Sequence, residues 1–149
     1  MSSISAEAER AGFESVWIVE GTGTDAFVAS TEIALNTSTI RIGTDIVSTF
    51  TRHPCVLASA SASVDMVAKG RFRLGLGASH QSIVENQLGL SFTKPIKRME
   101  ETIQILTKIF ASREPISFNG EIFAISNYSL SSGLFANILT FTLLREALV

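Results

Sequence analysis

The order of short apolar runs and helical segments constrains the fold more than any other feature of this sequence. Three runs, at residues 16–19, 40–47 and 72–77, are rich in branched or aromatic residues and are bounded by polar residues or glycine. Such runs are typical of buried strands. Helical patterns lie between them, and strand–helix alternation with short connections predicts a parallel sheet with right-handed crossovers. The sequence therefore predicts an α/β fold.

The helical segments carry recognisable start and stop signals. They are expected at residues 5–11, 25–35, 54–69 and 95–112. Gly12 and Gly70 follow two of them, where a left-handed residue ends a helix. Thr24 is the expected N-cap of the second helix, and Pro54 suits the first turn of the third. The chain opens on a helix, so a preceding strand is expected but absent.

The last of these helices has the clearest apolar face. Met99, Ile103, Leu106 and Phe110 recur at helical spacing. Arg98, Glu101, Gln104 and Lys108 lie largely elsewhere on the helix. The spacing predicts that this helix packs against the core through one stripe.

The sequence after residue 112 divides into two parts. Residues 116–125 contain Asn119-Gly120 between β-prone runs, which predicts a hairpin. From residue 126 the pattern is lost, and residues 134–149 are apolar without a clean period. We therefore expect an incomplete domain over 1–125 and a divergent tail over 126–149, the abrupt change being typical of a frameshift or premature stop. A C-terminal helix over the exposed sheet is the alternative.

Composition narrows the classes of partner and compartment. The 149 residues are 46% hydrophobic and 17% charged, a globular composition, and the net charge of −2 gives no basic field for nucleic acid. No apolar stretch approaches the roughly 20 residues of a membrane span. One cysteine, Cys55, and the lack of a signal peptide fit a cytoplasmic protein.

In parallel α/β folds ligands meet the carboxyl ends of the strands. Glu20 follows the first strand and is either a ring-side hydrogen-bonding group or a solvated carboxylate. Arg52 or His53 could meet an anionic ligand group at the start of the next helix. The alternative is that His53 simply caps the helix that starts at Pro54. After the third strand, glycines 75 and 77 give either close backbone approach or tight packing, and His80 either reaches substrate or is an exposed loop residue.

Other chemistries find no support in the sequence. No Cys/His cluster has zinc spacing, so no metal site is expected. There is no P-loop and no nucleophile elbow. Without a phosphate loop after the first strand, a flavodoxin-like binding domain is disfavoured. Trp17 is expected in the core rather than as a stacking platform.

Taken together, several segments resemble the luciferase-like monooxygenase superfamily. They are AERAGFESVWIVE, IRIGTDIVSTFTRHPCVLASASASVDMVAKGRFRLGLGASH, GLSFTKPIKRMEETIQIL and ISFNGEIFAI. The likeness covers about residues 8–125 and is nearest the F420-dependent branch, which includes methylenetetrahydromethanopterin reductase. It implies a partial TIM (β/α)8 barrel: about three parallel strands, flanking helices and a β-hairpin. It also implies an oxidoreductase that transfers hydride between F420, or alternatively FMN, and an organic substrate.

The resemblance also implies site residues. The cofactor-binding positions carried over are Glu20, Thr44, Asp45, Ile46, Ala78 and Ser79. His53 and His80 are the candidate substrate-binding residues, and no catalytic residue is assigned. Many relatives have a histidine where this chain has Gly21, which puts proton transfer there in doubt. Relatives also often hold a cis peptide at the position of Asp45–Ile46.

An incomplete barrel leaves sheet edges and one apolar face uncovered. We therefore expect trans geometry at Asp45–Ile46, on the reasoning that the partners holding the bulge are missing. Marginal stability and assembly as a homo-oligomer or with a complementing chain are expected for the same reason. The alternative to a cofactor-binding oxidoreductase fragment is a non-catalytic remnant that acts as an interaction or assembly partner.

Overall fold

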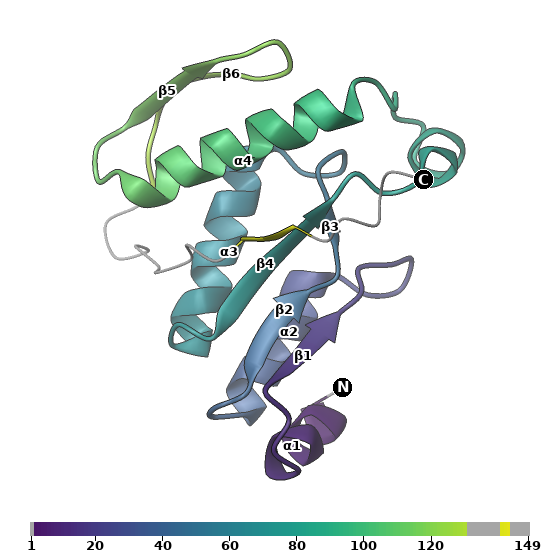
Figure 1. The fold of residues 1–149 in the computed structure, drawn as a ribbon, viewed down its shortest axis with the longest axis vertical. Coiled ribbons are helices and arrows are strands. Elements are labelled where there is room, and N and C mark those ends of the chain that lie inside the picture. The colour runs from purple at the N-terminus through teal and green to yellow at the C-terminus, as the bar shows by residue number, and fades with distance from the viewer. Residues whose placement is uncertain (1, 131–140, 144–149) are drawn as a thin grey trace.

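The computed structural model describes residues 2–130 and 141–143. Its helices and strands follow one another along the chain as a series of strand–helix units ending in a hairpin (Figure 1). They are α1 (Ser2–Arg10), β1 (Ser15–Ile18), α2 (Ala26–Asn36), β2 (Arg41–Thr44), β3 (Val47–Ser48), α3 (Pro54–Ala68), β4 (Phe72–Gly77), the π-helix η1 (Ile83–Gln87), α4 (Pro95–Ala111), β5 (Ile116–Asn119), β6 (Ala124–Tyr128) and β7 (Phe141–Leu143). None of the described helices is long and apolar enough to cross a membrane.

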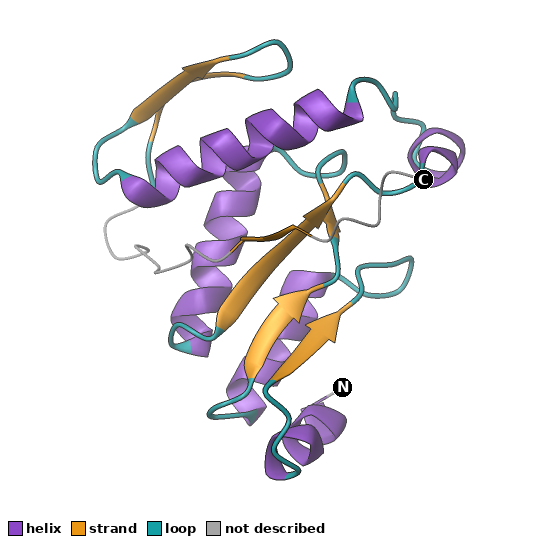
Figure 2. Ribbon diagram, viewed as in Figure 1, coloured by secondary structure: helices purple, strands orange, loops and turns teal. Residues whose placement is uncertain are grey.

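The main sheet is parallel, as the alternation predicts. Its order is β1-β2-β4-β3, with β7 also paired to β4. The arrows of β1, β2 and β4 point the same way in Figure 2, so their carboxyl ends share one edge. The expected strand at 40–47 is divided into β2 and β3. Residues 141–143 of the expected tail form β7; the rest of the segment 134–149 lies outside the described residues.

Helices α2 and α3 cover one face of the sheet (Figure 1). Phe72, Leu74 and Leu76 alternate along β4 and are at most 2% exposed, so they form the centre of the core. Residues between them belong to the other face, because successive side chains of a strand point to opposite sides. Burial of this apolar surface is the main favourable contribution to folding.

Trp17 lies on that other face, so the expectation that it belongs to the core is wrong. Its neighbour Ile18 is 5% exposed, whereas Trp17 is 41% exposed. Its indole ring lies over Gly43, the facing residue of β2, where any Cβ would overlap the ring. Strand alternation turns Trp17 away from the helices, and the short apolar run at 16–19 gives no sign of which of its residues face them.

The connection between β2 and β3 contains a cis peptide at Asp45–Ile46, so the expectation of trans geometry is wrong. The neighbours that hold this segment are present in the chain. Asp45 N donates to the carbonyl of Ile18 on one side, at 2.7 Å. On the other side the Ile46 side chain fills the space above Gly77 of β4. The segment between β2 and β3 is thus held between β1 and β4.

The helix boundaries follow the local signals closely. Gly12 and Gly70 have φ of +83° and +84°, as expected of residues that end helices. The N-cap of α2 is Asp25, not Thr24: its Oδ1 accepts from the backbone N–H groups of Phe27 and Val28. A carboxylate one residue later caps the helix better than the threonine, because it lies two and three positions before those donors.

Glu9 fastens α1 to the start of β2. Its carboxylate accepts hydrogen bonds from the backbone N–H groups of Ile40, Thr39 and Ser38, and from the Thr39 hydroxyl, at 2.6–3.1 Å. These bonds, led by those from Ile40 and Thr39, lower the pKa of Glu9 from 4.5 to about 2. The first helix is therefore positioned by a carboxylate that binds mainly backbone N–H groups.

Glu101 of α4 lies off the apolar stripe read from the sequence, yet it is fully buried. It is 1% exposed and accepts hydrogen bonds from the backbone N–H groups of Glu121, Ile122 and Phe123. Burial raises the pKa of Glu101, but these donors outweigh it and the net pKa is lowered. The periodicity of α4 cannot reveal this, because the partners lie in the predicted β5–β6 hairpin about twenty residues later.

Candidate active site

A cleft of about 910 Å³ opens at the carboxyl ends of the strands. Residues from each strand–helix connection line it. They are Glu20, Gly21, Thr22, Thr24, Asp25, Ile46, Ser48, Thr51, Arg52, His53, Val56, Ser79, Ile83, Gln87 and Leu88. Its size lies within the range of small-molecule sites, roughly 300–1,000 Å³. Four of the residues expected in the site, Glu20, Ile46, His53 and Ser79, are therefore brought together in one wall.

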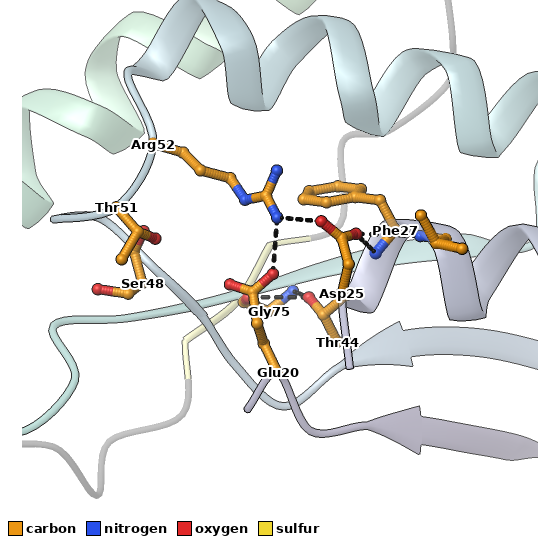
Figure 3. Close-up of polar contacts among 9 residues, drawn as sticks. Glu20, Asp25, Phe27, Thr44, Ser48, Thr51, Arg52 and Gly75 are labelled. Atoms are coloured by element: carbon orange, nitrogen blue, oxygen red, sulfur yellow. Dashed lines mark hydrogen bonds and ion pairs between the residues drawn. The ribbon is translucent and has the colours of Figure 1, made fainter. Parts of the chain in front are cut away.

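One side of the cleft is built around Arg52, which precedes α3. Its Nη2 donates to Glu20 Oε1 at 2.8 Å and to Asp25 Oδ2 at 2.6 Å, and its guanidinium lies 4.9 Å from the centre of the Phe27 ring (Figure 3). Burial works to lower the pKa of Arg52, but the two carboxylates raise it overall. Arg52 thus stays charged and is shared by two carboxylates.

Asp25 has a separate role for each carboxylate oxygen. Oδ1 caps α2, and Oδ2 pairs with Arg52. Burial opposes its charge, yet the Arg52 hydrogen bond and the backbone donors of α2 lower the pKa of Asp25. Two carboxylates and one guanidinium leave this side of the cleft with a formal charge of −1.

The expected cofactor residues at the end of β2 lie at different depths. Thr44 is fully buried: its hydroxyl donates to the Gly75 carbonyl at 2.9 Å and accepts from Gly75 N at 2.8 Å. It therefore joins β2 to β4 beneath the cleft (Figure 3). Asp45 is exposed and does not line the cleft, whereas Ile46 contributes its side chain to the wall.

The residues after β4 separate in the same way. Ala78 is buried and lies outside the lining, while Ser79 lines the cleft with a left-handed φ of +67°. His80 is exposed and not part of the lining, and its carbonyl accepts from the N–H groups of Ile83 and Val84 at the start of η1. The structure thus places only Ser79 of these three in the cleft wall.

His53 both caps α3 and lines the cleft, so the two alternatives open in the sequence are compatible. Its Nδ1 accepts from Cys55 N at 3.2 Å. The ring also packs edge-on against Phe123, with 5.3 Å between ring centres. Burial, and then the positive charge of Arg98, lower the pKa of His53.

Several lining residues were not foreseen. Asp25 carried a usable signal, because it directly precedes a helical pattern and is a strong N-cap type. Ser48 and Thr51 also line the cleft, and they lie in the strand-end region where ligands are expected. The π-helix η1 supplies Ile83 and Gln87, and no sequence pattern announces it; such π-turns occur frequently at functional sites.

Known proteins have similar sequences and share this architecture. The 5,10-methylenetetrahydromethanopterin reductase of Archaeoglobus fulgidus is 30% identical over 124 residues, which is 83% of this chain and 37% of that protein. The coenzyme F420-dependent tetrahydromethanopterin reductase of Methanopyrus kandleri superposes with a TM-score of 0.83 at 21% identity, covering 96% of this chain and 46% of that structure. The FMN complex of the oxygenating component of 3,6-diketocamphane monooxygenase from Pseudomonas putida superposes with a TM-score of 0.72 at 20% identity. The match covers 83% of this chain and 37% of that structure.

The chain spans about a third of the length of the curated relatives it matches. The structural neighbours are TIM-barrel enzymes, and the strands and helices described above correspond to part of such a barrel, as the sequence predicts. A family model described as luciferase-like monooxygenase matches residues 2–133. With most of its length matched, this chain belongs to the luciferase-like monooxygenase family.

Proposed function

We propose that this chain forms the ring-binding part of the cofactor cleft of an F420-dependent oxidoreductase, with FMN as the alternative cofactor. The enzyme would transfer hydride between the (deaza)flavin ring and a small organic substrate. The observation that carries this proposal is the cleft at the strand ends, in which Glu20, Ile46, His53 and Ser79 meet. The relative from Archaeoglobus and the structures named above are reductases and monooxygenases, and one is named as F420-dependent.

The residues of the cleft fit a flat ring with polar edges. Ile46 and Val56 offer apolar surface, while Ser79 and Thr51 offer hydroxyl groups. A bound deazaflavin or flavin supplies the hydride-accepting and hydride-donating chemistry. The protein's own contribution here is to bind and orient the ring, and to hold the polar groups of the wall in place.

The charges of the cleft favour the ring end of such a cofactor over its phosphate end. Among the described lining residues, Arg52 is the only Lys or Arg, and it is already paired with Glu20 and Asp25. A phosphate group placed here would meet a net charge of −1. We therefore infer that Glu20 serves to orient Arg52, and that phosphate is bound by other parts of the protein.

Equilibrium titration of the full chain with F420 and with FMN, followed by the visible absorbance of each, tests the proposal. We expect F420 to bind more tightly. Val56→Arg, on α3 and 53% exposed, should block the cleft and weaken binding about tenfold or more. Met66→Arg is the matched control, because it lies on the same helix, is 58% exposed and does not line the cleft.

Three results would count against the proposal in different ways. Tighter binding of FMN would reverse the cofactor preference. Equal effects of the Val56 and Met66 variants would remove the cleft as the binding site. Binding of neither cofactor would favour the alternative, in which the chain acts as an interaction or assembly partner.

We also infer that further polypeptide, from a second copy or a complementing chain, covers the sheet face opposite α2 and α3. Support comes from Trp17 and Val19, which are 41% and 66% exposed on β1 and its C-terminal extension. Exposed apolar groups of this size are typical of interaction surfaces. Light scattering on the purified chain measures its mass in solution, and Trp17 fluorescence reports whether the indole is covered; a monomer with a solvated indole would refute the inference.

A further inference from the structure

His53 is fixed in one chemical form by the start of α3. Pro54 is the first residue of the helix and has no N–H, so Cys55 supplies the donor that the His53 Nδ1 accepts, at 3.2 Å. A ring nitrogen that accepts a hydrogen bond carries no hydrogen. In the neutral imidazole the hydrogen must therefore be on Nε2.

The surroundings of the ring keep it neutral. Behind it lies Phe123, edge-on at 5.3 Å and 86°, and the Arg98 guanidinium of α4 lies 5.1 Å from the centre of that phenyl ring. Arg98 is held there by a second ring, Phe50, at 4.7 Å. Protonation of His53 would place a positive charge near Arg98. It would also set an Nδ1–H against the N–H of Cys55.

The other ring nitrogen forms no hydrogen bond with the described residues. His53 is exposed and lines the cleft. Within the described part of the chain, its only side-chain hydrogen bond is the one through Nδ1. A neutral imidazole with its acceptor occupied can offer a ligand one hydrogen bond, and only as a donor.

We propose that His53 is a specificity-determining residue whose Nε2–H donates a hydrogen bond to an oxygen or nitrogen acceptor of the ligand, such as a ring carbonyl. Its Nδ1 meanwhile holds the start of α3. The inference rests on the proposed function only in taking the cleft as the ligand site. A ligand that presents a donor or a cation at this point is disfavoured, because His53 has no acceptor left to offer it.

The tautomer can be measured without any ligand. The chain has two histidines, His53 and His80. Nitrogen-15 NMR of the imidazole rings therefore gives two sets of signals, and His80→Gln assigns them. We expect His53 to show the neutral Nε2–H form at neutral pH. An Nδ1–H form or a protonated ring at His53 would overturn the proposal.

Three variants separate the donor from the cap. Asp and Ser are good N-cap residues, and thermal unfolding checks that all three variants fold. In His53→Gln the amide NH2 group reaches about as far as the imidazole Nε2 and keeps an N–H donor, whereas His53→Asp has acceptors only and His53→Ser is too short to reach the ligand. In titrations with F420 and FMN we expect the Gln variant to retain most of the affinity and the Asp and Ser variants to lose about tenfold, as the loss of one hydrogen bond implies.

The outcomes distinguish this proposal from the function on which it rests. Wild-type affinity in both His53→Asp and His53→Ser would refute the hydrogen bond while leaving the cofactor cleft intact. Loss in Asp alone would show that its charge, not the missing donor, is responsible, and would also refute it. If neither cofactor binds the wild-type chain, the proposed function and the ligand contact fall together, and the NMR result alone decides the tautomer.

Discussion

Removal of the Glu101 carboxylate should weaken the whole structure and loosen the β5–β6 hairpin in particular. The carboxylate receives Glu121 N–H on Oε1 at 2.7 Å, and the N–H groups of Ile122 and Phe123 on Oε2, both at 3.0 Å. In Glu101→Ala, all three donors lose their partner. The Phe123 N–H is buried and cannot turn to water, whereas the other two are partly buried.

The size of the effect follows from this difference in burial. A buried donor left without a partner costs about 1–3 kcal/mol, and a hydrogen bond that water can replace contributes about 0.5–1.5 kcal/mol. We expect Glu101→Ala to lower the free energy of unfolding by about 3 kcal/mol. Glu101→Gln should cost about half as much, because its single oxygen can serve Ile122 and Phe123 while its NH2 group faces the N–H of Glu121. Against a typical total of 5–15 kcal/mol this is a large loss.

Urea denaturation gives the free energy, and amide hydrogen exchange at residues 121–123 gives the local effect. Glu100→Ala is the matched control. Glu100 adjoins Glu101 in sequence but is exposed, and its carboxylate pairs with Lys97 at 3.0 Å on the surface, so we expect the free energy of unfolding to change by less than about 0.5 kcal/mol. If Glu101→Ala and Glu100→Ala have equal effects, or if the three amides keep their protection in Glu101→Ala, the reasoning is refuted.

Three further predictions concern the backbone and the pH dependence of stability. Because the pKa of Glu9 is lowered, the stability that its carboxylate contributes is complete above about pH 4.5 and is lost as the pH falls towards about 2. The difference in urea midpoint between wild type and Glu9→Gln should therefore shrink over that range, and a constant difference would contradict this prediction. Gly75→Ala should destabilise by about 3 kcal/mol or more, because its Cβ would overlap the Thr44 carbonyl oxygen, while Gly21→Ala, with open space around it, should stay within about 0.5 kcal/mol in the same denaturation assay. Lys69→Gly should raise the melting temperature. Lys69 has a left-handed φ of +54° at the end of α3, and glycine adopts that backbone conformation at a cost lower by about 1 kcal/mol. A lowered melting temperature would be the contrary result.

The parts of the fold that the sequence predicts are those set by local chemistry. Gly12 and Gly70 end helices because few other residues adopt their backbone angles at low cost. The strand at Phe72–Gly77 coincides with its apolar run. One wrong expectation, Thr24 in place of Asp25 as the N-cap of α2, is a local choice between adjacent residues. The other features that escape prediction involve partners distant in the chain. Burial of Glu101 depends on a hairpin twenty residues later, and the exposure of Trp17 depends on which face of the sheet the helices cover.

The site shows the same division. The rule that ligands meet the carboxyl ends of parallel strands is enough to bring Glu20 and Ser79 to one wall. It does not resolve depth, so Thr44 lies beneath the cleft and Asp45 beside it. Nor does it show that Arg52 is already engaged, because its two partners come from the connection between β1 and α2.

The two oxygens of Asp25 allow the cleft to rearrange without damage to the fold. Oδ1 holds the start of α2, and only Oδ2 is committed to Arg52. A guanidinium that swings towards an incoming group would break its bond to Oδ2, yet the first turn of α2 would keep its cap. Adaptability at the surface of the cleft is thereby separated from the integrity of the scaffold.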